Sequence, residues 1–386
     1  MKASAWALAA LLVFGTLTLW VEERWAWSVF QIGVFLLAAF RVMKARAWRI
    51  PPPVWPLATA CCWVFLQAIS QRTISPARTW IAALDWFTFL TLFAVSWDVL
   101  SHQESRRWFL RAVTGFGMVT AVAATLQNYS SGGRIFWLFP SGYTDGVMGP
   151  FVNRGQYSAW IELLLPVALY LALSDQRRRE LWGVAAAVLF GSMVAGASRA
   201  GFLLCGGELL AVLAMAGVRK LVSRKTLLMA GIQVVTLAGI ATAVAGWQGL
   251  QTRLESQGPE SLRLDAVHAS IQMARDHPWF GVGLGTWNTV YPAYAEMDSG
   301  LFMNQAHNDW AQWVAEGGVA FLLLLVAFAV LCCRTALPSI YGIGVVAFLL
   351  HALVDFPMQQ RPVLAAWFFV MAGAASAWTK PARVNL

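Results

Sequence analysis

The stretch NQAHNDWAQWVAEGGVAFLLLLVAFAVLC, residues 304–332, decides the fold class. From Asp309 onward it is long and apolar enough to cross a bilayer as one helix. Apolar runs of about 20 residues recur along nearly the whole chain. They do not alternate in hydropathy, as the strands of a membrane β-barrel would. The sequence therefore predicts an all-α integral membrane protein.

The composition supports this prediction. The 386 residues are 59% hydrophobic and only 12% charged, whereas a soluble domain has about 25% charged residues. The first apolar run, residues 5–20, resembles a signal peptide. A second apolar run follows at once without a clear cleavage site, so we expect a retained first helix.

Twelve membrane helices are expected, separated by breaks with turn chemistry such as PPP at 51–53 and SGG at 131–133. Their expected ranges are 4–21, 25–43, 54–72, 79–99, 108–127, 155–173, 181–197, 201–218, 226–246, 309–332, 336–354 and 362–378. The whole chain is expected to form one polytopic domain, residues 1–386, with two long outer loops. These loops are residues 128–153 and residues 247–308, and the second is long enough to hold short helices.

The distribution of basic residues predicts the orientation of the chain. With the N-terminus inside, the clusters RVMKARAWR (41–49), QRRR (176–179) and RKLVSRK (219–225) all fall on the inner side. Basic residues concentrate on the cytoplasmic side of membrane proteins. We therefore expect both termini in the cytoplasm, and we expect the net charge of +9 to face membrane lipids, not nucleic acid.

The five cysteines indicate neither disulfides nor a metal site. All of them lie inside apolar runs, and none has a C-x-x-C spacing. They are expected to be buried apolar side chains.

Two arginines on the outer side stand where stability does not explain them. Arg199 lies in MVAGASRAGFLL between two apolar runs, with no acidic neighbour in the sequence. It either snorkels to the headgroups or binds an anionic ligand. Arg263 opens an expected helix that runs from a Ser261 cap to about His277, and a cation there opposes the helix dipole. That helix is expected to bury the stripe Leu264, Val267, Ile271 and Ala274.

The run GVGLG at 281–285 does not fit a phosphate-binding loop. It matches neither glycine fingerprint and follows no expected strand. We interpret it as a tight turn that returns the chain to the membrane.

His307 lies at the start of the tenth expected helix, where it shares a face with Ala311, Val314 and Gly318. The positive end of a helix lowers the pKa of an imidazole and so favours a neutral ring that accepts a proton. From spacing alone, His307 is equally well a helix cap or a general base.

Other catalytic centres are less well supported. His268, His277 and His307 share the outer side but have no HExxH spacing, so zinc is not expected. The chain has no GxSxG elbow. His351 and Asp355 are four residues apart and are expected on one helix face, as a structural pair or as part of the site.

Four motifs occur together in the order GPFVNRGQYSAWIELLLPVAL (149–169), GASRAG (196–201), RLDAVHASIQMARDHPWFGVGLGTW (263–287) and AHNDWAQWVAEGG (306–318). This pattern resembles the O-antigen ligase/polymerase superfamily (Wzy_C-type) of bacterial polytopic membrane glycosyltransferases, over roughly residues 145–362. The sequence NRGQ at 153–156 departs from the family, since many relatives carry a second Asn two residues after the first.

The resemblance implies a GT-C-like helical enzyme of the bacterial inner membrane with a periplasmic active site. The implied donor is a glycan on undecaprenyl diphosphate, and the acceptor is a sugar hydroxyl of lipid A-core or of another lipid-linked glycan. No metal or other cofactor is implied, and the transfer inverts the sugar. The functional residues of the family fall on Arg199, Arg263 and His307.

We therefore expect Arg199 and Arg263 to bind the diphosphate and His307 to act as the base. Arg154, Arg275, Asn153 and Asn308 are secondary candidates for substrate contact. A polymerase with the same chemistry is the first alternative, and a transporter of lipid-linked sugars is the second. Glu162 and Glu208, inside apolar runs, are the feature that would favour transport. The sequence does not separate ligase from polymerase.

Overall fold

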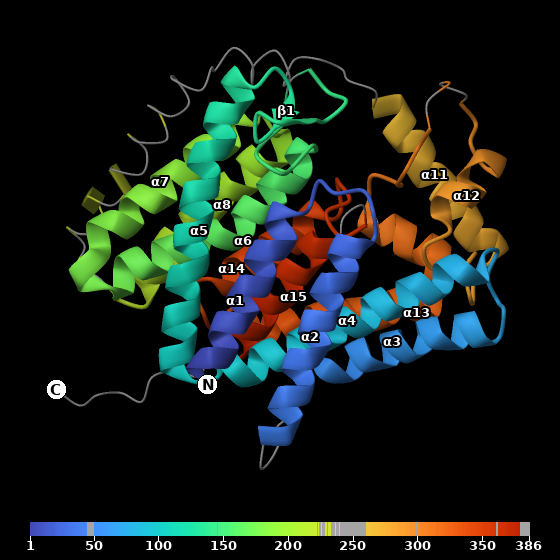
Figure 1. Ribbon diagram of the computed structural model, residues 1–386, viewed down its shortest axis with the longest axis horizontal. Helices are drawn as coiled ribbons and strands as arrows, with labels where there is room; N and C mark the ends of the chain where they lie inside the picture. The colour runs from blue at the N-terminus through green and yellow to red at the C-terminus, as the bar shows by residue number, and fades with distance from the viewer. Residues whose placement is uncertain are drawn as a thin grey trace.

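The computed structural model describes residues 1–44, 50–144, 146–221, 260–297, 302–359 and 362–378, together with Gly300 and single positions between 223 and 239. Within these residues the chain is helical apart from one short hairpin (Figure 1). In chain order the elements are α1 (Lys2–Leu17), α2 (Trp25–Lys44), α3 (Val54–Ile69), α4 (Pro76–Leu100), α5 (Gln103–Ser130), β1 (Arg134–Ile135), β2 (Phe139–Pro140), α6 (Arg154–Ser174), η1 (Gln176–Arg178), α7 (Arg179–Ala195), α8 (Arg199–Val218), α11 (Glu260–Asp276), α12 (Trp287–Val290), η2 (Tyr291–Ala293), α13 (Asp309–Ala336), α14 (Gly342–His351) and α15 (Pro362–Ser376).

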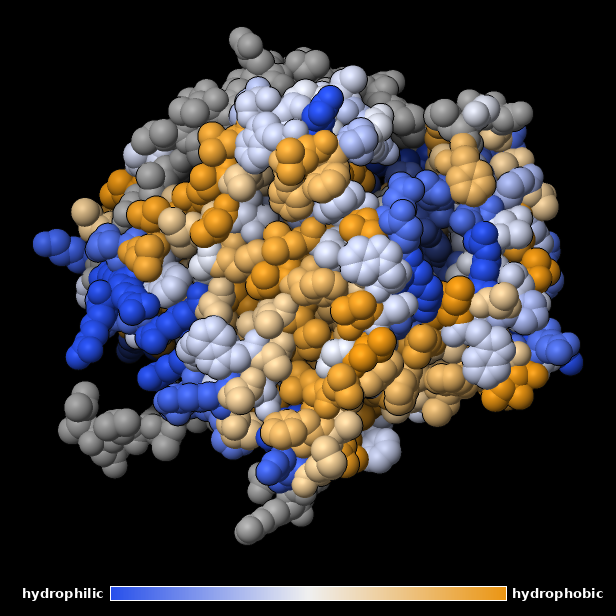
Figure 2. All heavy atoms as spheres, in the orientation of Figure 1, coloured by the Kyte–Doolittle hydropathy of each residue, from blue (hydrophilic) through white to orange (hydrophobic). Residues whose placement is uncertain are grey.

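Eleven of the twelve expected helices correspond to helices of the structure, with ends that differ by several residues. The expected helix 226–246 lies largely outside the described residues. Six described helices, α2, α4, α5, α6, α8 and α13, are long and apolar enough to cross a membrane. Figure 2 shows apolar side chains across the middle of one face, with hydrophilic groups toward its edges. The chain is thus a multi-pass membrane protein, and the number twelve stays a prediction.

The centre of the bundle is formed by α6 and α15. Nearly every side chain of α15 is buried, because its apolar residues surround the whole helix and do not form a stripe. Trp160 of α6 meets Trp367 of α15 edge to face, with ring centroids 5.8 Å apart. The indole nitrogen of Trp367 donates to Thr16 Oγ1 of α1 over 2.8 Å, so its one polar atom is satisfied.

Polar contacts join the helix ends at one end of the bundle. Arg41 of α2 pairs with Asp98 of α4, and Arg111 of α5 pairs with Asp175 after α6, each over 2.8 Å. These are the ends that the sequence assigns to the cytoplasmic side. At the opposite end, α11, α12 and the β1 hairpin extend from the bundle (Figure 1). The five cysteines are free, as expected.

Helix α13 is broken at Gly318, so the expectation of one continuous span is wrong. Gly318 has φ +74° and ψ −179°, which no helix contains. Residues 309–317 form a segment about 14 Å long, and residues 319–336 form one about 27 Å long. Only the second segment approaches the roughly 30 Å of a hydrocarbon core.

The turn 281–285 satisfies the backbone groups exposed by this break. The amides of Val282 and Gly283 donate to the carbonyls of Ala315 and Glu316, each over 2.9 Å. Gly281 and Gly283 reach these carbonyls with φ of +66° and +109°, a region that glycine occupies without strain. The interpretation of GVGLG as a tight turn is confirmed.

We expect Gly318→Ala to destabilise the protein by about 1–3 kcal/mol, because an alanine at this φ is strained. The added Cβ would also meet the backbone of Pro278 and Trp279. The measurement is the apparent melting temperature of the purified protein in detergent.

Gly206→Ala is the matched control. Gly206 lies within α8, and a Cβ there would meet nothing within 4 Å. Alanine is the better helix former by about 1 kcal/mol, so this variant should be neutral or more stable. Equal melting temperatures for the two variants would contradict the role of Gly318.

Candidate active site

His307 precedes α13 and does not belong to its first turn. The residue has φ +54°, in the left-handed region, and Asn308 is the N-cap. The expectation that His307 shares a helix face with Ala311, Val314 and Gly318 is therefore wrong. The left-handed backbone places His307 outside the helix, so its ring does not continue that face.

The neighbours of His307 fix it to the loop 352–359. Asn308 Oδ1 accepts from the amide of Ala311 over 2.9 Å, and its Nδ2 donates to the carbonyl of Leu353 over 2.7 Å. The amide of Asp309 donates to the carbonyl of Ala352 over 2.9 Å. The buried Asp309 Oδ2 accepts from the amide of Met358 over 3.0 Å. The backbone on both sides of this contact is thus held in place.

The ring of His307 keeps one nitrogen available. It meets Phe356 edge to face with ring centroids 4.6 Å apart. Within the described residues, its buried Nδ1 has no hydrogen-bond partner. A buried polar atom without a partner is unusual and indicates a group that a ligand completes.

The surroundings of His307 favour its neutral form. Burial lowers the pKa of His307, the positive charge of Arg263 lowers it further, and the negative charge of Asp355 opposes both. Since a neutral imidazole accepts a proton, the ring is prepared for general-base chemistry near neutral pH. The sequence predicted the same direction of the pKa shift. It attributed the shift to the helix dipole, whereas the causes in the structure are burial and Arg263.

Arg263 lies in the first turn of α11 with an exposed side chain. It acts electrostatically on both His307 and Asp355. Of the predicted residues, Arg263 and His307 are thus directly coupled. Arg275 lies about 18 Å further along the same helix, at 1.5 Å per residue. Its predicted contact with substrate stays a prediction.

The buried face of α11 differs from the expected stripe, since Leu264 and Ile271 are exposed. The buried residues are Asp265, Ala266, Ala269, Ser270 and Met273. Asp265 accepts from the Tyr291 hydroxyl over 2.6 Å, and Ser270 accepts from the Trp287 indole over 2.8 Å. The hydrophobic periodicity of α11 alone could not reveal that its polar residues bind the aromatic residues of α12 and η2. The helix includes Ser261, which is therefore not its cap.

The first turns of α6 and α8 pack against each other. Asn153 caps α6 by accepting from the amides of Gly155 and Gln156, and Ser198 caps α8 by accepting from the amide of Gly201. The hydroxyls of Ser158 and Ser198 lie 2.9 Å apart and join the two turns. Arg154 and Arg199 are the first residues of these helices. Backbone N–H groups at helix starts attract anions.

Asp355 connects these helix starts to His307. Its carboxylate occupies the space where a Cβ of Gly155 would lie, at the start of α6. Its charge also acts on His307 and Arg263. The starts of α6 and α13 therefore both contact the loop 352–359, and the start of α8 packs against that of α6. Figure 2 shows a hollow with hydrophilic walls beside α11, over the start of α13.

The structure shows what the two predicted asparagines do, and it adds Asp355 to the candidate site. Both Asn153 and Asn308 use their side-chain oxygens as helix caps. Asp355 is the residue whose place in the site the sequence left open, and its signal was the four-residue spacing from His351. Among the described residues, no group of three or more His, Cys, Asp or Glu side chains could hold a metal ion.

We expect Arg263→Met to raise the pKa of His307, because the substitution removes a positive charge that lowers it. The measurement is an NMR titration of the purified protein with labelled histidine, in which His307→Asn identifies the resonance. Arg275→Met is the matched control and should leave the titration unchanged. The coupling is refuted by equal midpoints in Arg263→Met and the wild type.

Residues 184–326 match the family model described as O-antigen ligase. The matched segment contains Arg199, Arg263 and His307 but neither Arg154 nor Asp355. A search of curated proteins finds no match. The resemblance found in the sequence is confirmed by this match, which supports the O-antigen ligase/polymerase family over residues 184–326.

Proposed function

We propose that this protein is a metal-independent, inverting glycosyltransferase of the bacterial inner membrane. It would move a glycan from undecaprenyl diphosphate to a sugar hydroxyl of lipid A-core at the periplasmic face. The family supports ligase- or polymerase-type activity. The observation that carries the assignment is the buried Nδ1 of His307, which has no partner in the described chain and stands beside a cation that favours the neutral ring.

His307 would act as the general base. Nδ1 takes the proton of the acceptor hydroxyl as its oxygen attacks the anomeric carbon. The bond between that carbon and the phosphate oxygen breaks on the opposite face, so the sugar is inverted. The electron pair of this bond leaves with undecaprenyl diphosphate, and the proton stays on His307 until solvent removes it.

Arg263 and Arg199 would bind the diphosphate and stabilise the charge that grows on it. A guanidinium grips phosphate oxygens through two parallel N–H bonds. Arg263 would approach from α11, and Arg199 would approach from the start of α8. The positive ends of the α6 and α8 dipoles would add to this stabilisation, with Arg154 as a further contact. In this arrangement the cations supply what a divalent metal supplies in other transferases.

Asn153 and Asn308 would support the site by capping α6 and α13. Each side-chain oxygen is engaged in capping a helix, so neither oxygen is available to a sugar. Their predicted contacts with substrate would have to use the amide nitrogens, and that of Asn308 is held by Leu353.

His307→Asn should lower the rate of transfer by at least about 100-fold, the lower range for loss of a general base. Asn is the matched substitution because it tolerates the left-handed backbone of residue 307. The assay measures transfer of glycan from undecaprenyl diphosphate to lipid A-core by purified protein in EDTA. The wild-type rate should fall at acidic pH, as the ring of His307 becomes protonated.

Arg263→Ala and Arg199→Ala should lower transfer strongly in the same assay, and Arg275→Ala should lower it least. Wild-type activity in His307→Asn would refute the base. Activity that EDTA abolishes and a divalent metal restores would refute the metal-independent mechanism.

A deletion strain separates ligase from polymerase. For a ligase, we expect lipopolysaccharide without its polymer cap, while full-length polymer accumulates on its lipid carrier. Products with a single repeat unit would instead assign polymerase activity. The measurement is gel analysis of lipopolysaccharide and of carrier-linked glycan from the same cells, with the complemented strain as control.

A further inference from the structure

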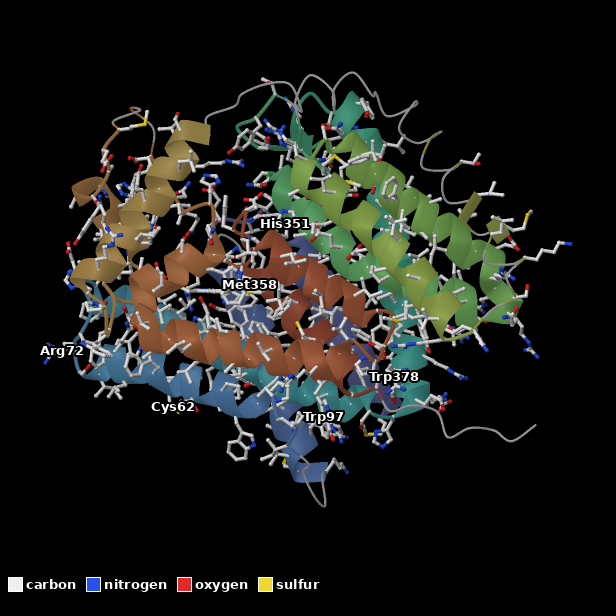
Figure 3. All side chains as sticks on the ribbon, turned by 180° about the vertical axis from the view of Figure 1, so that it is seen from behind. Cys62, Arg72, Trp97, His351, Met358 and Trp378 are labelled. Carbon is white, nitrogen blue, oxygen red and sulfur yellow. The ribbon has the colours of Figure 1, made fainter. Side chains whose placement is uncertain are left out.

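A buried ionisable pair lies directly behind the candidate site. Glu162 of α6 and His351 at the end of α14 are both fully buried. His351 Nδ1 lies 2.7 Å from Glu162 Oε1, so the two side chains share a hydrogen bond. Figure 3 shows His351 in the interior of the molecule, near Met358. Glu162, which had no partner in the sequence, thus has one in the structure.

The pair extends toward the site through Asp355. The other ring nitrogen of His351, Nε2, lies 3.8 Å from Asp355 Oδ2, one helical turn further along the chain. Asp355 Oδ1 accepts from the amide of Phe356 over 2.9 Å. The carboxylate also packs on Gly155. Glu162, His351 and Asp355 therefore form a row that leads from the interior of α6 to the loop beside His307.

Stability does not account for this row. Transferring carboxylates from water into an apolar bundle has a desolvation penalty that their mutual attraction rarely recovers. Apolar residues of similar volume would fill the same space at no loss of stability. Ionisable residues retained inside membrane helices are usually functional.

The charges around the row define what it can do. Glu162 on α6, Asp355 and the buried Asp309 on α13 all act electrostatically on His351. The contact with Glu162 fixes the His351 ring, and the fixed ring keeps Nε2 3.8 Å from Asp355 Oδ2. A protonated His351 would hold the carboxylate of Asp355 as an anion. That anion in turn faces His307 and Arg263.

We propose that Glu162 and His351 are positioning residues that hold Asp355 as an oriented anion beside His307, so that Asp355 stabilises the imidazolium formed when His307 takes the acceptor proton. The inference rests on the proposed role of His307 as the base. It assigns to Glu162, in the interior of α6, a part in the reaction.

The test uses the isosteric variants Glu162→Gln and Asp355→Asn and their combination in the full-length protein. Glu162→Gln should lower kcat about tenfold, the loss expected for one hydrogen bond to a charged group. It should also shift the acidic limb of the pH–rate profile to lower pH, because Asp355 raises the pKa of His307. In the Asp355→Asn background, Glu162→Gln should cause little further change in kcat or in the acidic limb, because Glu162 and His351 act through Asp355.

Asp85→Asn is the matched control. Asp85 is also a carboxylate inside the bundle, and it accepts hydrogen bonds from Trp27 and Gln31 over 2.8 and 3.1 Å. It has no contact with the row, so its variant should keep the acidic limb of the wild type. A merely structural role of Glu162 would lower the melting temperature and leave the acidic limb in place, and this result would overturn the proposal.

Two further measurements keep the test decisive. His351→Gln should reproduce the shift if Glu162→Gln does not fold. The NMR titration of His307 needs no substrate, so it separates this inference from the proposed function. A midpoint that moves to lower pH in Glu162→Gln supports the row even if the purified protein transfers no glycan. An unmoved midpoint overturns the row even if transfer is observed.

Discussion

The carbonyls freed at the break of α13 have to find donors inside an apolar bundle, where an unsatisfied backbone group costs several kcal/mol. Each of the three carbonyls before Gly318 has a donor. Val282 and Gly283 serve Ala315 and Glu316, and the indole of Trp63 donates to Gly317 over 2.9 Å. The buried Gln67 also donates to Glu316 over 2.9 Å. Because these donors come from α3 and from the turn after α11, the break joins α3 and α13 to the segment 260–297 that carries Arg263.

Much of the fold could be predicted from the sequence because it follows from length and hydropathy. Helices such as α2 and α8 lie within a residue or two of their expected ranges, since an apolar run that must cross a bilayer has few alternatives. The break at Gly318 could not be predicted in this way. Glycine is common in membrane helices, and only the distant donors from Gln67 and the 281–285 turn make a break tolerable there.

The candidate site was predictable in its residue types but not in its geometry. The sequence identified His307 and Arg263, and the structure couples them electrostatically. It could not reveal the left-handed backbone of His307, which depends on contacts with a loop some 45 residues later. The partner of Glu162 was hidden for the same reason, because no local pattern indicates that α6 and α14 place it against His351.

The contacts of Asp309 affect more than the position of the proposed base, His307. Its backbone and side chain bind the loop 352–359, so His307 and Asp355 belong to one preorganised unit. Little reorganisation is then required when a proton moves, which is the condition for efficient electrostatic catalysis. In the proposed reaction this unit acts only on the hydroxyl of the acceptor and the anomeric carbon of the donor, which every such transfer has in common. A ligase and a polymerase can therefore share it unchanged, and the difference between them has to lie in the outer surfaces that bring the acceptor to His307.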